Sequence, residues 1–67
     1  MILRVNGEDR QYPSEISDVG RLLQKLGIKT DRAAVEINGV ITDPKKFCQT
    51  QLHEKDQIEI VSFVGGG

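Results

Sequence analysis

The chemical group that stands out in this sequence is the carboxylate at its end. An alternating apolar segment, residues 58–63, runs into Val64-Gly65-Gly66-Gly67, the last four of 67 residues. Glycine has no Cβ and accepts almost any backbone conformation, so such a segment can pass through a narrow channel. Four extended residues reach about 14 Å, enough to place the carboxylate of Gly67 in the active site of another protein. The alternative interpretation is a frayed terminus or a remnant of an expression vector.

The side chains offer little support for catalysis within the chain itself. Cys48 is the lone cysteine, which excludes an internal disulfide and a CxxC pair, and a structural role is the simpler interpretation. His53, the one histidine, lies in a charged turn and is expected to be solvated. The aspartates are dispersed over turn and cap positions, so paired-carboxylate catalysis is not indicated. A phosphate-binding glycine loop lies between a strand and a helix, whereas these glycines end the chain. We therefore predict no catalytic side chain and no metal site.

Composition excludes several other classes of protein. Sixty-seven residues with 37% hydrophobic and 28% charged residues predict one small globular domain with little room for a buried catalytic pocket. A net charge of −1 and scattered basic residues argue against nucleic-acid binding. The apolar runs are too short for a membrane span or a signal peptide, so we expect a cytoplasmic protein without a membrane partner.

Periodicity divides the first half of the chain into a hairpin and one helix. Residues 1–5 alternate in polarity like a strand, and Asn6-Gly7 begins a turn that leads to a weaker strand at 10–12. Apolar residues at 19, 22, 23 and 26 are spaced as one face of a helix, which Gly27 ends. Three polar residues are candidates for the helix N-cap: Ser14, Ser17 and Asp18.

The second half of the chain reads as strands joined by short turns. Residues 34–38 form a predicted strand that ends at Asn38-Gly39, residues 40–41 pair briefly, and Asp43-Pro44 opens a short 3₁₀ segment to about residue 49. After a polar turn at 53–56, the last strand runs from Gln57 to about Phe63. We expect a mixed sheet in which the first and last strands are parallel neighbours, with the helix packed across one face. The expected core is Met1, Leu3, Val5, Leu22, Leu23, Leu26, Val35, Ile37, Ile58 and Ile60.

Four short motifs, taken in their order, resemble a known family. Val5-Asn6-Gly7, the Val-Glu-Ile-Asn-Gly of residues 35–39, the Asp-Gln-Ile-Glu-Ile of residues 56–60 and the final Val-Gly-Gly-Gly are similar to those of the ThiS-type sulfur carriers of thiamine biosynthesis. The resemblance covers essentially the whole chain. It implies an α+β, ubiquitin-like β-grasp fold, with a β-grasp domain at residues 1–63 and a flexible glycine tail at residues 64–67.

The resemblance also implies a chemistry for the terminal carboxylate. Such carriers are substrates: a ThiF-like adenylyltransferase activates the carboxylate with ATP and Mg²⁺. A sulfur donor, a cysteine desulfurase or a persulfide enzyme, then displaces AMP and leaves a thiocarboxylate. A ThiG-like thiazole synthase accepts that sulfur. On this basis Gly67 is the chemical site, Gly66, Gly65 and Val64 give it access, and the carrier binds no cofactor stably.

Two alternatives remain open from the sequence. The first is the small sulfur carrier of molybdopterin synthase, or another ubiquitin-like modifier that ends in Gly-Gly. The second is a non-catalytic interaction domain whose glycine tail has no function. Formation of a thiocarboxylate separates the second from the carriers, and the acceptor of the sulfur separates the two carrier types.

Strand alternation also predicts a docking surface. If Ile58 and Ile60 point inward, Val61 and Phe63 point away from the core. Ile2 on the first strand is expected to share that outer face. Exposed apolar clusters often mark binding sites, so these residues are candidates for partner recognition. Alternatively, they cap the edge of the sheet, or a bulge turns Phe63 inward.

Overall fold

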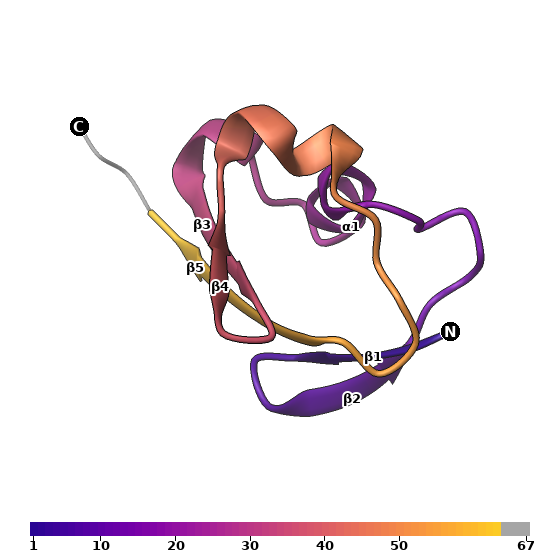
Figure 1. The fold of residues 1–67 in the computed structure, drawn as a ribbon. Helices are drawn as coiled ribbons and strands as arrows, with labels where there is room; N and C mark the ends of the chain where they lie inside the picture. Colours follow the sequence, from indigo (N-terminus) through magenta and orange to yellow (C-terminus); the bar gives the residue numbers. More distant parts are fainter. Residues whose placement is uncertain (64–67) are drawn as a thin grey trace.

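The computed structural model describes residues 1–63, and the predicted flexible tail at 64–67 lies outside the described residues. A five-stranded sheet curves around one α-helix and a 3₁₀ segment (Figure 1). The elements follow in the order β1 (Ile2–Val5), β2 (Glu8–Gln11), α1 (Val19–Lys25), η1 (Thr30–Arg32), β3 (Ala33–Ile37), β4 (Val40–Thr42), η2 (Pro44–Gln49) and β5 (Gln57–Ser62).

The last strand in sequence lies at the centre of the sheet. The strand order is β2-β1-β5-β3-β4, with β5 parallel to β1 and antiparallel to β3. The parallel pairing of the first and last strands confirms the sequence-based prediction. In consequence, both edges of the first part of β5 are covered, and the chain leaves the sheet from a central strand.

Two Asn-Gly pairs make the tight hairpin turns. Asn6 and Asn38 have φ of 50° and 51°, and the glycines that follow have φ of 83° and 87°. Type I′ turns require positive φ at both central positions, which Asn-Gly tolerates best. The first turn is tighter than predicted, because Val5 pairs directly with Glu8 and β2 therefore begins two residues earlier than residue 10. All four residues of β2 are exposed, so polarity alternation could not mark its start.

The helix begins and ends at identifiable residues. Of the three candidate N-caps, Asp18 is the one used: its Oδ1 accepts a hydrogen bond from the Arg21 backbone N–H at 2.8 Å. Gly27, at φ +75°, follows the helix as predicted. Gly20 permits close packing on η2, because a Cβ there would lie 2.8 Å from the Sγ of Cys48.

The core lies between the inner face of the sheet and α1 with η2. Seven of the ten predicted core residues are buried, and Met1, Leu26 and Ile37 pack against them while partly exposed. The structure adds buried side chains that no regular periodicity marks: Tyr12, Ile16, Phe47 and Leu52. Within residues 1–63 no helix has both the length and the apolar character needed to cross a membrane.

Candidate functional site at the end of the last strand

The amide side chain of Asn6 holds the middle of β5. Its Oδ1 accepts a hydrogen bond from the Ile60 N–H at 2.7 Å, and its Nδ2 donates to the Ile60 carbonyl at 3.2 Å. The Asn6 backbone N–H also donates to the Ile58 carbonyl at 2.8 Å. The side chain therefore continues the β1–β5 pairing beyond the point where β1 turns away. Asparagine suits this position because one amide supplies both a donor and an acceptor.

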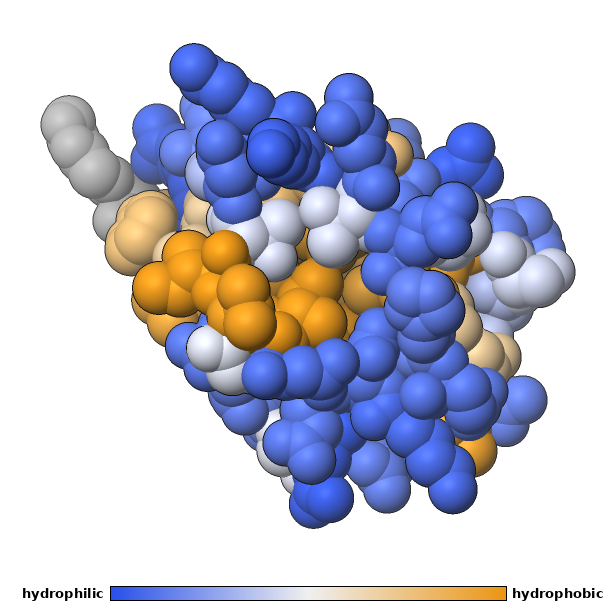
Figure 2. Space-filling view, in the orientation of Figure 1, coloured by the Kyte–Doolittle hydropathy of each residue, from blue (hydrophilic) through white to orange (hydrophobic). Residues whose placement is uncertain are grey.

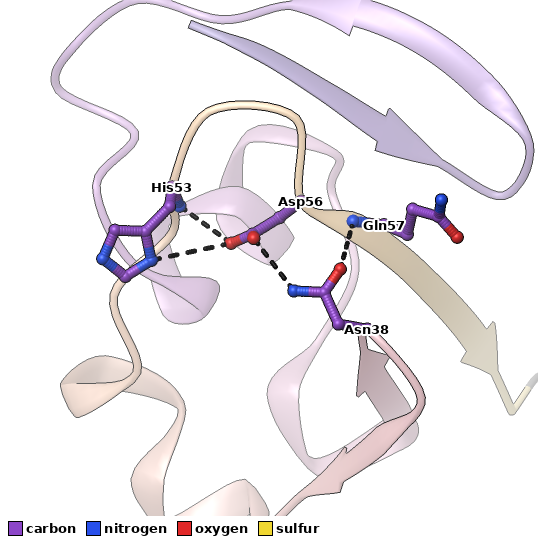
Figure 3. Close-up of polar contacts among 4 residues, drawn as sticks. All are labelled: Asn38, His53, Asp56 and Gln57. Atoms are coloured by element: carbon purple, nitrogen blue, oxygen red, sulfur yellow. Dashed lines mark hydrogen bonds and ion pairs between the residues drawn. The ribbon is translucent and has the colours of Figure 1, made fainter.

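Asn38, in the second Asn-Gly turn, holds the start of β5 from the other side (Figure 3). Its Oδ1 accepts from the Gln57 N–H and its Nδ2 donates to Oδ1 of Asp56, both at 3.0 Å. The other oxygen of the buried Asp56 carboxylate accepts from the His53 N–H at 2.8 Å, with His53 Nδ1 at 3.8 Å. These contacts give the buried carboxylate hydrogen-bond donors from two loops, which offsets the cost of removing it from water.

Beyond Ile60 the surroundings of β5 change. The register with β3 continues through Val61 and Ser62, whereas pairing with β1 ends at Ile58. The Phe63 N–H donates to the carbonyl of Arg32 at 2.7 Å, so the last described residue is held by the end of η1, directly before β3. Val61 and Phe63 are 58% and 57% exposed, as alternation predicted, and no bulge turns Phe63 into the core.

The outer face beside Val61 carries a small apolar depression of about 130 Å³. It is lined by Ala34, Val35, Glu36, Ile41, Glu59 and Val61. Apolar surface gathers near the end of β5, bordered by hydrophilic surface (Figure 2). Ile41 is 77% exposed, and the sequence analysis missed it. Val40 is opposite Ile37 in the register, on the side of the core. Side chains alternate along β4, so the next residue, Ile41, is on the outer face.

Ile2 is on the same outer face as Val61, as predicted, but the two side chains do not belong to one apolar cluster. Arg4 is opposite Gln57 in the register, so Ile2 lies two residues before that point while Val61 lies four residues after it. Ile2 is 38% exposed and lines a different depression together with Lys55 and Gln57. The apolar neighbour of Val61 on this face is therefore Ile41. Whether any of these residues binds a partner stays a prediction.

Other side chains on the described part of the chain do not assemble a reactive centre. Within residues 1–63 no group of three or more His, Cys, Asp or Glu side chains is placed to hold a metal ion. Cys48 is exposed on η2, and His53 is exposed beside Asp56. The predicted chemical site, Gly67, and its access residues Gly66, Gly65 and Val64 lie outside the described residues. The structure thus describes β5 and Phe63, the residues that precede that segment in the chain.

A mixed five-stranded sheet around one helix, with the last strand central, is a β-grasp domain. Its family is given by comparison with known proteins. The model of the ThiS family matches residues 3–67, nearly the whole chain. The chain belongs to the ThiS family.

Relatives and solved structures agree with this assignment. The chain is 32% identical over 66 residues to the sulfur carrier protein ThiS of Bacillus subtilis, covering 98% of this chain and 100% of that protein. A crystal structure of the thiamine biosynthesis protein ThiS from Geobacter metallireducens matches with a TM-score of 0.82 and 32% identity, covering 100% of both chains. A thiazole synthase of Paramagnetospirillum magneticum is 37% identical over 67 residues, and there the chain spans 20% of the relative's length.

Proposed function

We propose that this chain carries sulfur on the carboxyl group of Gly67. It is a ThiS sulfur carrier of thiamine biosynthesis, a protein substrate and not a catalyst. The match over the full length of the Bacillus subtilis carrier is the observation on which the proposal chiefly rests. The predicted molybdopterin-type alternative is not favoured, because the family model and the named relatives belong to thiamine biosynthesis.

The chemistry requires activation, because a carboxylate is an anion at neutral pH and a poor electrophile. An adenylating enzyme joins the Gly67 carboxylate to the α-phosphate of ATP, with Mg²⁺ on the phosphates, and pyrophosphate leaves. Sulfide, or the terminal sulfur of a persulfide, then attacks the acyl carbon and AMP leaves. Sulfide gives the thiocarboxylate directly, whereas a persulfide gives an acyl disulfide that a thiol must reduce. ATP and Mg²⁺ belong to the partner, and the carrier itself holds no cofactor.

The partners follow from this sequence of steps. A thiazole synthase accepts the sulfur; relatives with that name contain a segment similar to this chain. A ThiF-like adenylyltransferase and a cysteine desulfurase or persulfide enzyme complete the set, and we place the whole exchange in the cytoplasm. Phe63 and Val61, with Ile2 further along the same face, are the proposed contacts for these partners.

Mass spectrometry tests the proposal directly. The chain is incubated with the adenylating enzyme of the same organism, ATP, Mg²⁺ and sulfide, and a sample without ATP is the control. Replacement of one oxygen by sulfur at the activated carboxyl group adds about 16 Da to the mass of the chain. Fragmentation should locate that increase on the glycine tail. An unchanged mass in the complete mixture would refute the proposal. Transfer of the sulfur to thiazole synthase, and not to the large subunit of molybdopterin synthase, then identifies the acceptor.

A further inference from the structure

Two glutamates face each other across the centre of the sheet. Glu36 on β3 and Glu59 on β5 are directly opposite in the antiparallel register. Neighbouring Val35 and Ile60 are buried on the inner face, so both glutamates are on the outer face. Ile41 of β4 is paired with Glu36 on its other side. The outer face therefore carries a row of Ile41, Glu36 and Glu59, next to a row of Ala34 and Val61.

Nothing in the described part of the chain neutralises this pair. Neither carboxylate takes part in the ion pairs found within residues 1–63. On the outer face of the described strands, the positively charged side chain is Arg4. Its guanidinium lies 3.8 Å from a carboxylate oxygen of Asp9 and donates a hydrogen bond to the Gly7 carbonyl at 3.4 Å. Like charges directly opposite each other on neighbouring strands destabilise a sheet. The free domain therefore holds an unfavourable arrangement at a position where folding alone does not require it.

The location of the pair connects it to the chemistry of the tail. Glu59 is four residues before Phe63, and four further residues separate Phe63 from the end of the chain. Those four residues span at most about 14 Å. A protein that receives Gly67 in its active site must therefore come close to the end of β5, where the apolar depression and the glutamate pair lie.

We propose that the Glu36–Glu59 pair, with Ile41 and Val61 beside it, is the docking site for a basic surface of the thiazole synthase. Two uncompensated carboxylates call for an arginine or lysine on the partner, because charge complementarity sets specificity and association rate at interfaces. The thiazole synthase is the chosen occupant because relatives of that name contain, within their own chain, a segment similar to this whole chain. The inference rests on the proposed function.

The test compares two double variants of equal net charge. Glu36→Gln with Glu59→Gln removes the pair, whereas Glu8→Gln with Glu15→Gln removes two carboxylates elsewhere on the surface. Affinity for the thiazole synthase of the same organism is measured by titration calorimetry at low and high salt. We expect the first variant to bind about tenfold more weakly at low salt, with a smaller salt dependence, and the control to bind like the wild type.

Urea denaturation distinguishes a role of the glutamate pair in binding from a role in stabilising the fold. Removal of a like-charge pair should leave the urea midpoint of the first variant unchanged or higher, although its binding is weaker. Wild-type affinity and salt dependence in that variant would refute the docking site. Equal losses of affinity in both double variants would assign the effect to net charge and would also refute the docking site. A loss of affinity confined to the adenylating enzyme would refute the thiazole synthase as the occupant. Failure of the wild type to bind thiazole synthase would instead refute the proposed function.

Discussion

The two ends of β5 differ in how the rest of the domain holds them. Residues 57–60 have neighbours on both sides, and the side chains of Asn6 and Asn38 hold them by hydrogen bonds to main-chain atoms. Val61 and Ser62 pair with β3 alone, Phe63 bonds to the end of η1, and the side chains of Val61 and Phe63 are exposed. The first part of the strand thus contributes to stability, and the second presents surface for recognition. One strand can serve both purposes because β1 is its neighbour along the first part only. In the second part, alternate side chains point away from the core and are free to contact a partner.

The sharpest test of this comparison is removal of Gly67, which lies beyond both parts. The carboxyl then moves back by about 3.5 Å, and a misplacement of 1 Å can lower a rate about 100-fold. We expect adenylation, followed by ATP–pyrophosphate exchange, to fall at least that far, with an unchanged urea midpoint. Extension by one residue should have the same effect, and Gly66→Ala should impair the reaction through its added methyl group. A truncated chain that is adenylated at the wild-type rate would contradict the carrier mechanism.

In the first part of β5, Ile58→Ala should have the largest effect on stability. Ile58 is fully buried, and truncation of such a side chain costs about 2–5 kcal/mol of unfolding free energy. Val61→Ala on the same strand should change it by no more than about 0.5 kcal/mol, because its side chain is exposed. Urea denaturation measures both, and Ile58→Val, expected to cost about 0.5–1.5 kcal/mol, serves if the alanine variant does not fold. Equal effects at the two positions would remove the distinction.

The contribution of the Asn6 amide can be isolated from its backbone conformation. Asn6→Gly keeps the positive φ and removes both hydrogen bonds to Ile60, which should lower the unfolding free energy by about 1–3 kcal/mol. Asn6→Asp retains the acceptor for the Ile60 N–H and should lose less. Thermal and urea unfolding provide the measurement. A glycine variant as stable as the wild type would show that the turn alone holds β5.

At Phe63 a modest effect is expected, on partner binding and not on stability. Phe63→Ala should alter the unfolding free energy by no more than about 0.5 kcal/mol, because the ring is more than half exposed. Binding to the adenylating enzyme or the thiazole synthase should weaken by about tenfold, which corresponds to about 1.4 kcal/mol. Calorimetric titration alongside urea denaturation distinguishes the two effects. A strong loss of stability with unchanged binding would place Phe63 in the structural part of the strand.

Local patterns were sufficient to predict most of the fold. The alternation in residues 1–5 and 57–63, the apolar spacing of the helix and the two Asn-Gly turns all correspond to observed elements. The parallel neighbours β1 and β5 are confirmed as well. Less regular positions escaped prediction: Phe47 is buried from a 3₁₀ segment, and β2 lacks alternation because every residue in it is exposed. A periodic pattern of apolar residues predicts an element that buries one face. It predicts nothing where the buried positions are irregular or where no residue is buried.

For the candidate site, sequence determined which residues of β5 face outward, because the side-chain period of a strand is two. It also indicated the terminal glycines, whose lack of side chains is a local property. Only the tertiary structure decided which outward residues meet: Ile41 lies near Val61, Ile2 lies apart, and Glu36 is opposite Glu59. The hydrogen bonds from Asn6 and Asn38 to β5 were decided there too. The physical reason is register: segments far apart in the chain are aligned by burying the inner face as a whole, and no local pattern encodes that alignment.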